Sequence, residues 1–210
     1  MKTPLLIYGA GGLGREVLSL ARATDTFDVI GFLDDSLPKN SLIKGIKVFG
    51  GREALDSFDG KVNLVLAFGD PMLKSRIAAK IKQEKVLYPI LKHPTAILQD
   101  ESTIHIGNGS ILCAGCILTN DIRIDDHVLV NLNCTVGHDS TIGNYSSLMP
   151  GVNVAGEVGI GECVLVGSGS NILNRVRVGD NSIIGMGSVV IREIEPETTV
   201  AGVPAKKIRV

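Results

Sequence analysis

An aliphatic residue recurs at every sixth position through the second half of the chain. Counting from Ile106 in steps of six, fifteen consecutive positions hold Ile, Leu or Val, and the last of them is Val190. Two residues before each lies a second column, from Ile104 to Ser188, whose members are all Ser, Cys, Val or Ile. Neither the helical period of about 3.6 nor the strand period of about two explains this. The pattern predicts a β-solenoid in which each hexad forms one flat face and three hexads make one coil, so that fifteen hexads make five coils.

Glycine directly follows the aliphatic residue in seven of the fifteen hexads. Glycine accepts backbone conformations that other residues resist, so these positions are expected at the tight corners between faces. The seven glycines stand at positions 107, 137, 143, 161, 167, 179 and 185.

The composition changes near residue 93. Seven of the eight aromatic residues lie at or before Tyr88, and no lysine occurs from 93 to 205. Pro89 and Pro94 discourage regular structure between these halves. We therefore expect two domains, 1–93 and 94–210.

The first domain alternates between strand and helix patterns. Asp70 and Pro71 are typical of a helix start, and Leu73, Ile77 and Ile81 are spaced to form its buried side. This order predicts a small α/β unit with a parallel sheet, half of a Rossmann-like domain. The expected strands are 5–8, 29–33, 62–68 and 86–87, and the first helix is 15–23.

A glycine motif lies between the first expected strand and the first helix. Gly9, Gly11 and Gly14 have the spacing of a nucleotide-binding turn, in which a phosphate rests on the helix N-terminus. Asp34 and Asp35 end the second strand, where a carboxylate can accept a hydrogen bond from ribose. A tight turn without a ligand is the alternative. Since about 90 residues hold only half of a dinucleotide fold, one nucleotide, or a nucleoside diphosphate carrying another group, is favoured over NAD.

His138 belongs to a mostly polar column two residues after the aliphatic positions, so it is expected to point outward. Asp139 follows it, and Gly156 occupies the same position one coil later. Acyl transfer needs a base for the acceptor proton and a donor for the thioester oxyanion. His138 can be the base, Asp139 its orienting partner, and the Gly156 N–H the oxyanion donor, with room for a ligand above that glycine. The alternative is a surface histidine on a solenoid corner.

The remaining histidines and the cysteines indicate no further chemistry. His93 is interpreted as structural, His105 precedes the established repeat, and His127 is expected on a solvated face. The phase of the repeat points Cys116 and Cys134 inward, so we expect neither a metal site nor covalent thiol chemistry. Cys113 is expected at a corner and Cys163 exposed.

Charge, hydropathy and cysteine content exclude several classes of protein. Lys and Arg total 21 against 22 Asp and Glu, a net charge of −1, which argues against a general nucleic-acid binder. No apolar run approaches the roughly 20 residues that span a bilayer. Four cysteines do not make a disulfide scaffold, so we expect a cytoplasmic protein. From the charge balance and the short apolar runs, we expect no nucleic-acid and no membrane partner.

The repeat and the tail at 200–208 resemble those of the hexapeptide-repeat acyltransferases, which fold as left-handed parallel β-helices. Together with the N-terminal unit, the chain is similar to the NeuD/PglD-type sugar acetyltransferases along essentially its whole length. The motifs that carry this resemblance are Tyr8-Gly9-Ala10-Gly11-Gly12-Leu13-Gly14, Leu33-Asp34-Asp35, Ala67-Phe68-Gly69-Asp70, Gly137-His138-Asp139 and Val203-Pro204-Ala205-Lys206.

The resemblance implies a complete site. A nucleotide-linked amino-sugar would be held by the first domain, and acetyl-CoA would lie in a groove between neighbouring prisms of a homotrimer, with its phosphates near Lys206. The implied nucleotide contacts are Gly9, Gly11, Gly12, Leu13, Asp34, Asp35 and Gly69. The implied acetyl-CoA contacts are Ser147, Gly156, Ser168, Met186 and Lys206.

The expected fold is therefore an α/β half-Rossmann-like domain followed by an all-β left-handed parallel β-helix. The expected activity is acetyl-CoA-dependent N-acetylation of the 4-amino group of a nucleotide-linked deoxysugar, by direct attack on the thioester. One alternative is O-acetylation of sialic acid or another hydroxyl acceptor. The other is a solenoid scaffold that senses a nucleotide without catalysis.

Overall fold

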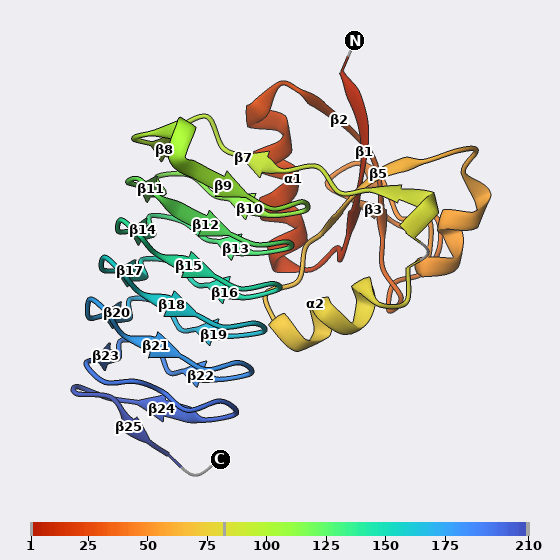
Figure 1. The fold of residues 1–210 in the computed structure, drawn as a ribbon. Helices are drawn as coiled ribbons and strands as arrows, with labels where there is room; N and C mark the ends of the chain where they lie inside the picture. The colour runs from red at the N-terminus through yellow and green to blue at the C-terminus, as the bar shows by residue number, and fades with distance from the viewer. Residues whose placement is uncertain (1, 82, 209–210) are drawn as a thin grey trace.

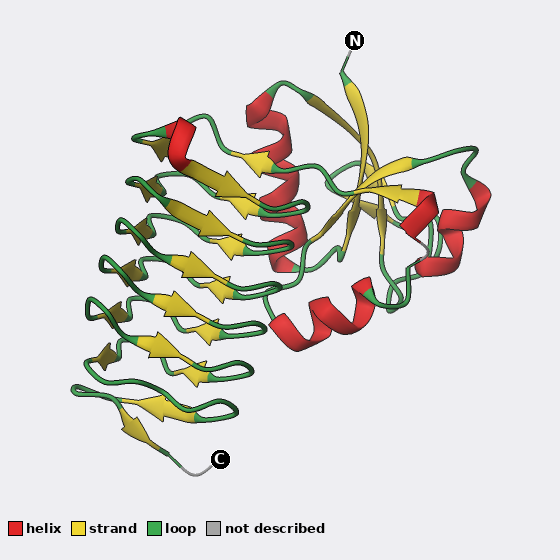
Figure 2. Ribbon diagram, viewed as in Figure 1, coloured by secondary structure: helices red, strands yellow, loops and turns green. Residues whose placement is uncertain are grey.

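A computed structural model describes residues 2–81 and 83–208 of the chain. An α/β unit and a long solenoid lie side by side, with α1 between the small sheet and the solenoid (Figure 1). Helix α2 packs on the other face of that sheet and also reaches the solenoid. Figure 2 shows that the solenoid consists of strands and turns, apart from a helical turn in its first coil. No helix in the described ranges combines the length and apolar character needed to cross a membrane.

The α/β unit has a four-stranded parallel sheet in the order β2-β1-β5-β6. All four expected strands and both helices are present, so the predicted half-Rossmann-like unit is confirmed. A two-stranded hairpin after β2 was not expected. The elements are β1 (Thr3–Tyr8), α1 (Gly12–Thr24), β2 (Phe27–Leu33), β3 (Leu42–Ile43), β4 (Ile46–Lys47), the 3-10 helix η1 (Arg52–Ser57), β5 (Val62–Leu66), α2 (Pro71–Ala78), the 3-10 helix η2 (Gln83–Lys85) and β6 (Val86–Leu87).

Helix α2 starts as predicted, but in its first turn it buries Lys74 and not Leu73. The Asp70 carboxylate accepts a hydrogen bond from the Leu73 N–H at 2.9 Å, which confirms the cap. Leu73 is 36% exposed, however, while Lys74 is only 2% exposed. Of the three positions expected on the buried side, Ile81 is buried and Ile77 is half-buried, so the prediction is wrong only for Leu73. At that end α2 also packs against the solenoid, and Lys74 makes that contact.

The solenoid is a parallel β-helix with three faces, named here in chain order, and its two inward columns are buried. Apart from the first and last coils, each strand pairs with the strand three hexads later, as in Leu129 with Ser147. Face 1 holds β7 (Leu91–Lys92), β10 (Ile111–Leu112), β13 (Leu129–Val130), β16 (Ser147–Leu148), β19 (Leu165–Val166), β22 (Ile183–Ile184), β24 (Thr199–Ala201) and the antiparallel β25 (Lys206–Lys207). Face 2 holds β8 (Ile97–Leu98), β11 (Ile117–Leu118), β14 (Thr135–Val136), β17 (Asn153–Val154), β20 (Asn171–Ile172) and β23 (Val189–Val190). Face 3 holds β9 (Ile104–Ile106), β12 (Ile122–Ile124), β15 (Thr141–Ile142), β18 (Gly159–Ile160) and β21 (Arg177–Val178).

The solenoid begins earlier than the repeat indicates. Face 2 has six strands, so the predicted number of five coils is one too few. In the first coil Leu91 pairs with Ile111 and Ile97 with Ile117, so this coil is two residues longer than three hexads. The 3-10 helix η3 (Glu101–Thr103) accommodates the two additional residues and breaks the six-residue count. Strand β7 therefore already pairs with the solenoid although it lies within the first 93 residues.

The backbone conformation at the corners also repeats every six residues. Every sixth residue from Gly109 to Gly187 has a positive φ, and Asp139 at φ 57° is one of them. The seven glycines that follow the aliphatic column lie two residues before such positions and do not have positive φ, so the expected reason for them is wrong. A Cβ on Gly137 would lie 2.7 Å from backbone atoms of the next coil. These glycines are required by the close approach of stacked coils.

Candidate active site

His138 lies on the edge of the prism between face 2 and face 3, two residues after β14. Its Nδ1 is 2.7 Å from Asp139 Oδ2, and the two side chains are 54% and 58% exposed. The carboxylate therefore fixes the ring through Nδ1 and leaves Nε2 for a substrate. The outward orientation of His138 agrees with the phase of the repeat.

Gly156 lies directly beneath the imidazole, one coil further along. A Cβ on Gly156 would lie 2.5 Å from Nε2 and 2.7 Å from Cε1 of His138. The expectation that Gly156 leaves room for a ligand is thus corrected, because the ring itself fills that space. Within the described residues no hydrogen bond engages the Gly156 N–H, which leaves this group available as a donor.

The carboxyl ends of β1 and β5 meet at the point where the strand order of the small sheet reverses. Open α/β sheets bind ligands outside the carboxyl ends of their strands at such a point, and we name this expected nucleotide site the nucleotide crevice. Gly11 and Gly12 are exposed there at the start of α1, and no atom lies within 4 Å of a Cβ built on either. A Cβ on Gly14 would lie 1.9 Å from the Gly9 carbonyl oxygen, so Gly14 permits the close packing of helix on strand. Leu13, in the first turn of α1, is half-buried.

The two aspartates after β2 hold the glycine turn in place. Asp34 Oδ2 accepts a hydrogen bond from the Ala10 N–H at 2.9 Å, and Asp35 Oδ2 accepts one from the Tyr8 hydroxyl at 2.7 Å. Burial raises the pKa of Asp34, but hydrogen bonds from Ser36 and the Ala10 N–H outweigh this and hold that pKa below its usual value. Both carboxylates are therefore engaged within the chain, in addition to any part in holding ribose.

Gly69 connects this crevice to the solenoid. It follows β5, and a Cβ on it would lie 3.0 Å from Met149 Cε, on the edge between face 1 and face 2. Any ligand that contacts Gly69 therefore lies close to that edge.

Ser147 is not open to a ligand in this chain. It is fully buried on face 1, and Lys74 Nζ donates a hydrogen bond to its hydroxyl at 3.2 Å. Burial lowers the pKa of Lys74 to about 7, although Cys163 and Asp70 act to raise it. The expectation that Ser147 contacts acetyl-CoA conflicts with this burial, since α2 covers the side chain.

His127 is buried, which contradicts the expectation of a solvated position. It is 6% exposed, stacks on Tyr145 with ring centroids 5.2 Å apart, and meets the Tyr88 ring edge-on at 4.5 Å. Burial and the nearby Lys74 lower the pKa of His127 to about 4. The sequence feature that could have predicted this burial is Tyr145, which lies three hexads later at the same corner of the next coil.

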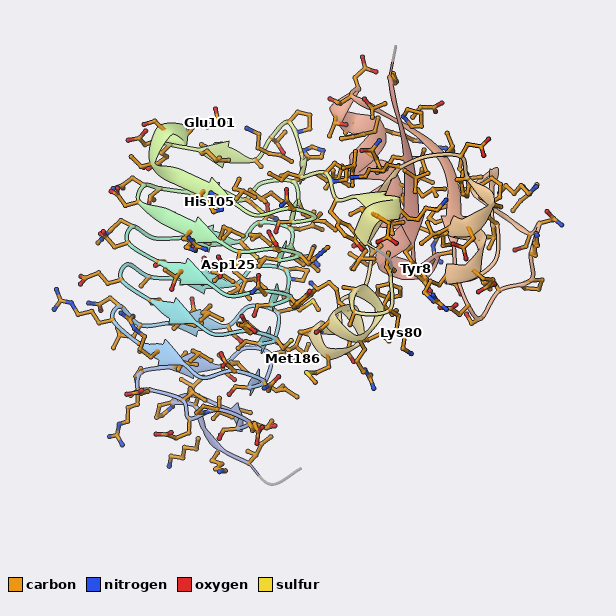
Figure 3. The ribbon with its side chains drawn as sticks, turned by 45° about the vertical axis from the view of Figure 1, so that its right-hand side comes forward. Tyr8, Lys80, Glu101, His105, Asp125 and Met186 are labelled. Carbon is orange, nitrogen blue, oxygen red and sulfur yellow. The ribbon has the colours of Figure 1, made fainter. Side chains whose placement is uncertain are left out.

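Two other expected acetyl-CoA contacts lie on a different edge from His138. Ser168 is half-buried and Met186 is 77% exposed on the edge between faces 1 and 2. Figure 3 shows Met186 on the side of the solenoid that faces the α/β unit. Because face 2 separates the two edges, one chain does not bring Ser168 and Met186 to His138. Lys206, the last of the expected contacts, is exposed in β25 at the C-terminal end of the solenoid.

The cysteines add no reactive group to the edge that carries His138. All four cysteines are free thiols, and burial raises the pKa of both Cys113 and Cys116 to about 12. In the described residues, no group of three or more His, Cys, Asp or Glu side chains is arranged to hold a metal ion.

Comparison with known proteins supports the same interpretation of the fold. Residues 4–81 match the family model described as the PglD N-terminal domain. The chain is 27% identical over 157 residues to GDP-perosamine N-acetyltransferase from Escherichia coli O157:H7, covering 72% of this chain and 70% of that protein.

Two solved structures are similar along nearly the whole chain. A histidine-to-asparagine variant of perosamine N-acetyltransferase from Caulobacter crescentus, in complex with CoA and GDP-perosamine, has a TM-score of 0.92 at 27% identity, covering 99% of this chain and 97% of that one. The acetyltransferase domain of PglB from Neisseria gonorrhoeae FA1090 has a TM-score of 0.90 at 30% identity, covering 99% of this chain and all of that one.

A left-handed parallel β-helix built from hexads is the fold of the hexapeptide-repeat acyltransferases. Within that class, the chain belongs to the NeuD/PglD-type sugar acetyltransferase branch.

Proposed function

We propose that the protein transfers the acetyl group of acetyl-CoA to the 4-amino group of a nucleotide-linked deoxysugar. The observation that carries this proposal is the arrangement of His138, Asp139 and Gly156 on one exposed edge, in a chain whose glycine turn is open. The relatives whose names specify perosamine N-acetylation support the class of acceptor.

The chemistry follows from the positions of these groups. His138 Nε2 removes a proton from the attacking amine as its nitrogen adds to the thioester carbonyl. Asp139 holds Nδ1 and stabilises the imidazolium that results. The Gly156 N–H donates to the developing oxyanion. The tetrahedral intermediate then collapses, the C–S bond breaks, and the thiolate leaves as CoA after taking up the proton from His138.

We also propose that each active site is shared between two chains of a homotrimer. Face 1 is covered by the α/β unit, and the His138 edge lies opposite that face, so the nucleotide crevice of a chain is remote from its own His138. If face 2 of each chain is turned toward a three-fold axis, the His138 edge of one chain meets the edge of its neighbour that carries Ser168 and Met186. The neighbour's crevice then supplies the acceptor.

The cytoplasm is the proposed location of this reaction. The four free thiols support a reducing compartment.

The experiment that tests the function is mass spectrometry of nucleotide amino-sugars incubated with acetyl-CoA and the protein. We expect a mass gain of one acetyl group on a nucleotide-linked 4-amino sugar, with GDP-, UDP- and dTDP-linked compounds compared. Acetylation of free sialic acid but of no amino-sugar would favour the O-acetyltransferase. Nucleotide binding by thermal shift without CoA binding or product would favour the scaffold.

A further inference from the structure

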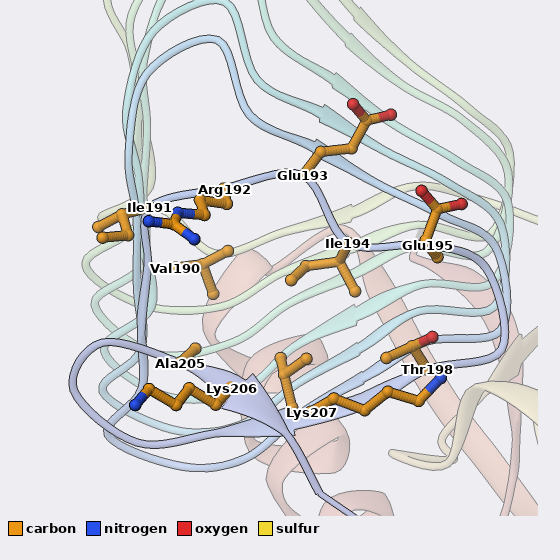
Figure 4. Close-up of a pocket in the computed structure, with 11 residues that line it drawn as sticks. Val190, Ile191, Arg192, Glu193, Ile194, Glu195, Thr198, Ala205, Lys206 and Lys207 are labelled. Carbon is orange, nitrogen blue, oxygen red and sulfur yellow. The ribbon is translucent and has the colours of Figure 1, made fainter.

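Helix α2 buries a lysine where it packs against the solenoid. Its buried residues are Pro71, Lys74 and Ala78, which are spaced as one side of a helix. Lys74 is only 2% exposed, although lysine is rarely buried unless it is paired with a charge. By comparison, Lys206 and Lys207 are exposed in β25, where they line a pocket of about 330 Å³ at the C-terminal end of the solenoid (Figure 4). The burial of a charged Lys74 therefore costs free energy that another group must offset.

No carboxylate offsets a charge on Lys74. Among the described residues its Nζ forms no ion pair, and the hydrogen bond that it donates goes to the neutral Ser147 hydroxyl at 3.2 Å. A protonated amine has three hydrogens and a full charge to place in this contact, whereas the neutral amine has two hydrogens and no charge. The contact with Ser147 therefore suits the neutral amine better.

The groups around Lys74 supply no negative charge inside this contact. The titratable groups that face it are Asp70 on α2 and, on the edge between faces 3 and 1, Cys163 and His127. Asp70 is exposed at the helix start, where its carboxylate accepts the capping hydrogen bond. Burial raises the pKa of Cys163 and lowers the pKa of His127 to about 4. Of these groups, only Lys74 changes its charge between pH 7 and pH 8.5.

The contact made by Lys74 lies beside the nucleotide crevice. Gly69 approaches Met149 on the edge of the solenoid, and Lys74, five residues further along, reaches Ser147 two residues before that methionine. Leu73 is exposed, so the apolar side chain next to Lys74 does not hold this turn of the helix on the solenoid. The position of Gly69 over Met149 therefore depends on the contact between Lys74 and Ser147.

A proton on Lys74 opposes the docking of α2 on the solenoid. Burial lowers the pKa of Lys74 from its ordinary value of 10.5 to about 7, and release of α2 would return the amine to water and to that ordinary value. Between these two values the released state holds a proton that the docked state lacks. Docking therefore strengthens as the pH rises from 7 toward 10.5, and below pH 7 it changes no further because both states carry the proton.

We propose that Lys74 is a positioning residue for the acceptor: its contact with Ser147 holds the Gly69 side of the nucleotide crevice against the solenoid, and proton uptake by its amine releases α2. The inference rests on the proposed function, because it takes the crevice as the site of the acceptor's nucleotide. Acidification toward pH 7 therefore weakens nucleotide binding. His138 lies on the edge between faces 2 and 3, away from this contact, and keeps its geometry.

Amide hydrogen exchange of the full chain tests the release of α2. Exchange would be followed by mass spectrometry at pH 7.0 and 8.5 for the wild type, Lys74→Met and Lys80→Met, and corrected for intrinsic rates. We expect the equilibrium constant for opening of α2 to be about tenfold larger at pH 7.0 than at pH 8.5 in the wild type, because the open state takes up a proton. Lys74→Met should show no such change. Lys80→Met, at an exposed position just after α2, is the matched control and should behave as the wild type.

Helix α1 is the internal reference for this measurement, because it packs on the other face of the sheet. An equal change in α1 would mean that the whole chain unfolds, and would overturn the inference of a local release. Opening of α2 that is independent of pH in the wild type would overturn it as well, as would a change that persists in Lys74→Met. The comparison of α2 with α1 in the wild type does not depend on the folding of a variant.

Calorimetric titration with GDP, UDP and dTDP tests the link to the acceptor. These probes carry no sugar amine, so the acceptor's own amine does not titrate in the measurement. We expect the dissociation constant of the wild type, divided by that of Lys74→Met, to be larger at pH 7.0 than at pH 8.5 by about twofold or more, because the open crevice binds less. If this ratio is equal at both pH values, only the inference fails. If none of the three probes binds at either pH, the proposed function fails, and the inference with it.

Discussion

At the scale of single residues, the candidate chemistry depends on how His138 is held. Asp139 adopts a positive φ at the corner, a conformation that Asp accepts more readily than most residues, and from there its carboxylate reaches Nδ1. Gly156 supports the ring from the next coil. Asp139 and Gly156 both orient the imidazole of His138, so the geometry of the site depends on the stacking of two coils.

Replacing the proposed base should remove activity without unfolding the protein. For His138→Asn we expect kcat to fall by roughly 10²–10⁴-fold, because the acceptor proton loses its base. The side chain is half exposed, so the melting temperature should stay near that of the wild type, and CoA should bind as tightly. Turnover close to the wild-type value would refute the role of His138.

Gly156→Ala tests the support beneath the ring. The new methyl would lie 2.5 Å from Nε2, so the imidazole must move, and we expect a large loss of kcat. Asn174→Ala, on the same edge one coil further, is the control and should retain the wild-type kcat. If Gly156→Ala left kcat unchanged while Asn174→Ala lowered it, the inferred contact would be wrong.

At the scale of elements, α2 joins the nucleotide crevice to the solenoid. Its cap residue Asp70 follows Gly69, and its Lys74 reaches Ser147, 73 residues away. Burial lowers the pKa of Lys74 from its ordinary value of 10.5 to about 7 in the folded chain. Between these values the unfolded chain holds a proton that the folded chain has released, so the free energy of unfolding rises with pH across this window.

Lys74→Met should therefore change the pH dependence of stability. Below pH 7 the folded wild type carries the whole cost of the buried charge, and we expect the variant to unfold at higher denaturant concentration at pH 6.5. This advantage should shrink as the pH rises to 9.5. Lys80→Met, at an exposed position just after α2, should show no such pH dependence; the same trend in both variants would argue against the buried amine as its cause.

Helix α1 depends on one of the two glycines in its first turn. In Gly14→Ala the methyl would meet the Gly9 carbonyl oxygen at 1.9 Å, and we expect a loss of roughly 1–3 kcal/mol in the free energy of unfolding. In Gly12→Ala the methyl meets nothing within 4 Å, so stability should be equal or up to about 1 kcal/mol greater. Urea denaturation of both variants checks this, and equal destabilisation would contradict it.

At the scale of the whole molecule, face 1 carries the α/β unit and the His138 edge lies on the other side of the prism. A site shared between chains predicts that two inactive variants complement each other. His138→Asn lacks the base, and Gly12→Asp places a carboxylate in the open crevice, where it repels a phosphate. Each alone should be inactive.

Co-assembled chains of these two variants should regain about a quarter of the wild-type activity per site, because each site then needs an intact base from one chain and an intact crevice from another. Activity assays on co-expressed, separately tagged chains would measure this. No recovery from assemblies shown to contain both chains would place the whole site within one chain.

The six-residue period by itself determined the parallel solenoid, its inward columns and the outward position of His138, because every coil repeats the same local environment. The cap at Asp70 likewise determined the start of α2, whereas α1 begins at Gly12, three residues before the expected start at residue 15. The tertiary structure decided what depends on contacts between distant segments: the buried Lys74 on Ser147, the burial of His127 between two tyrosines, the imidazole over Gly156, and the early first coil behind the η3 insertion. Periodicity encodes the local path of the backbone, whereas the docking of the α/β unit on face 1 depends on surfaces whose residues share no spacing in the sequence.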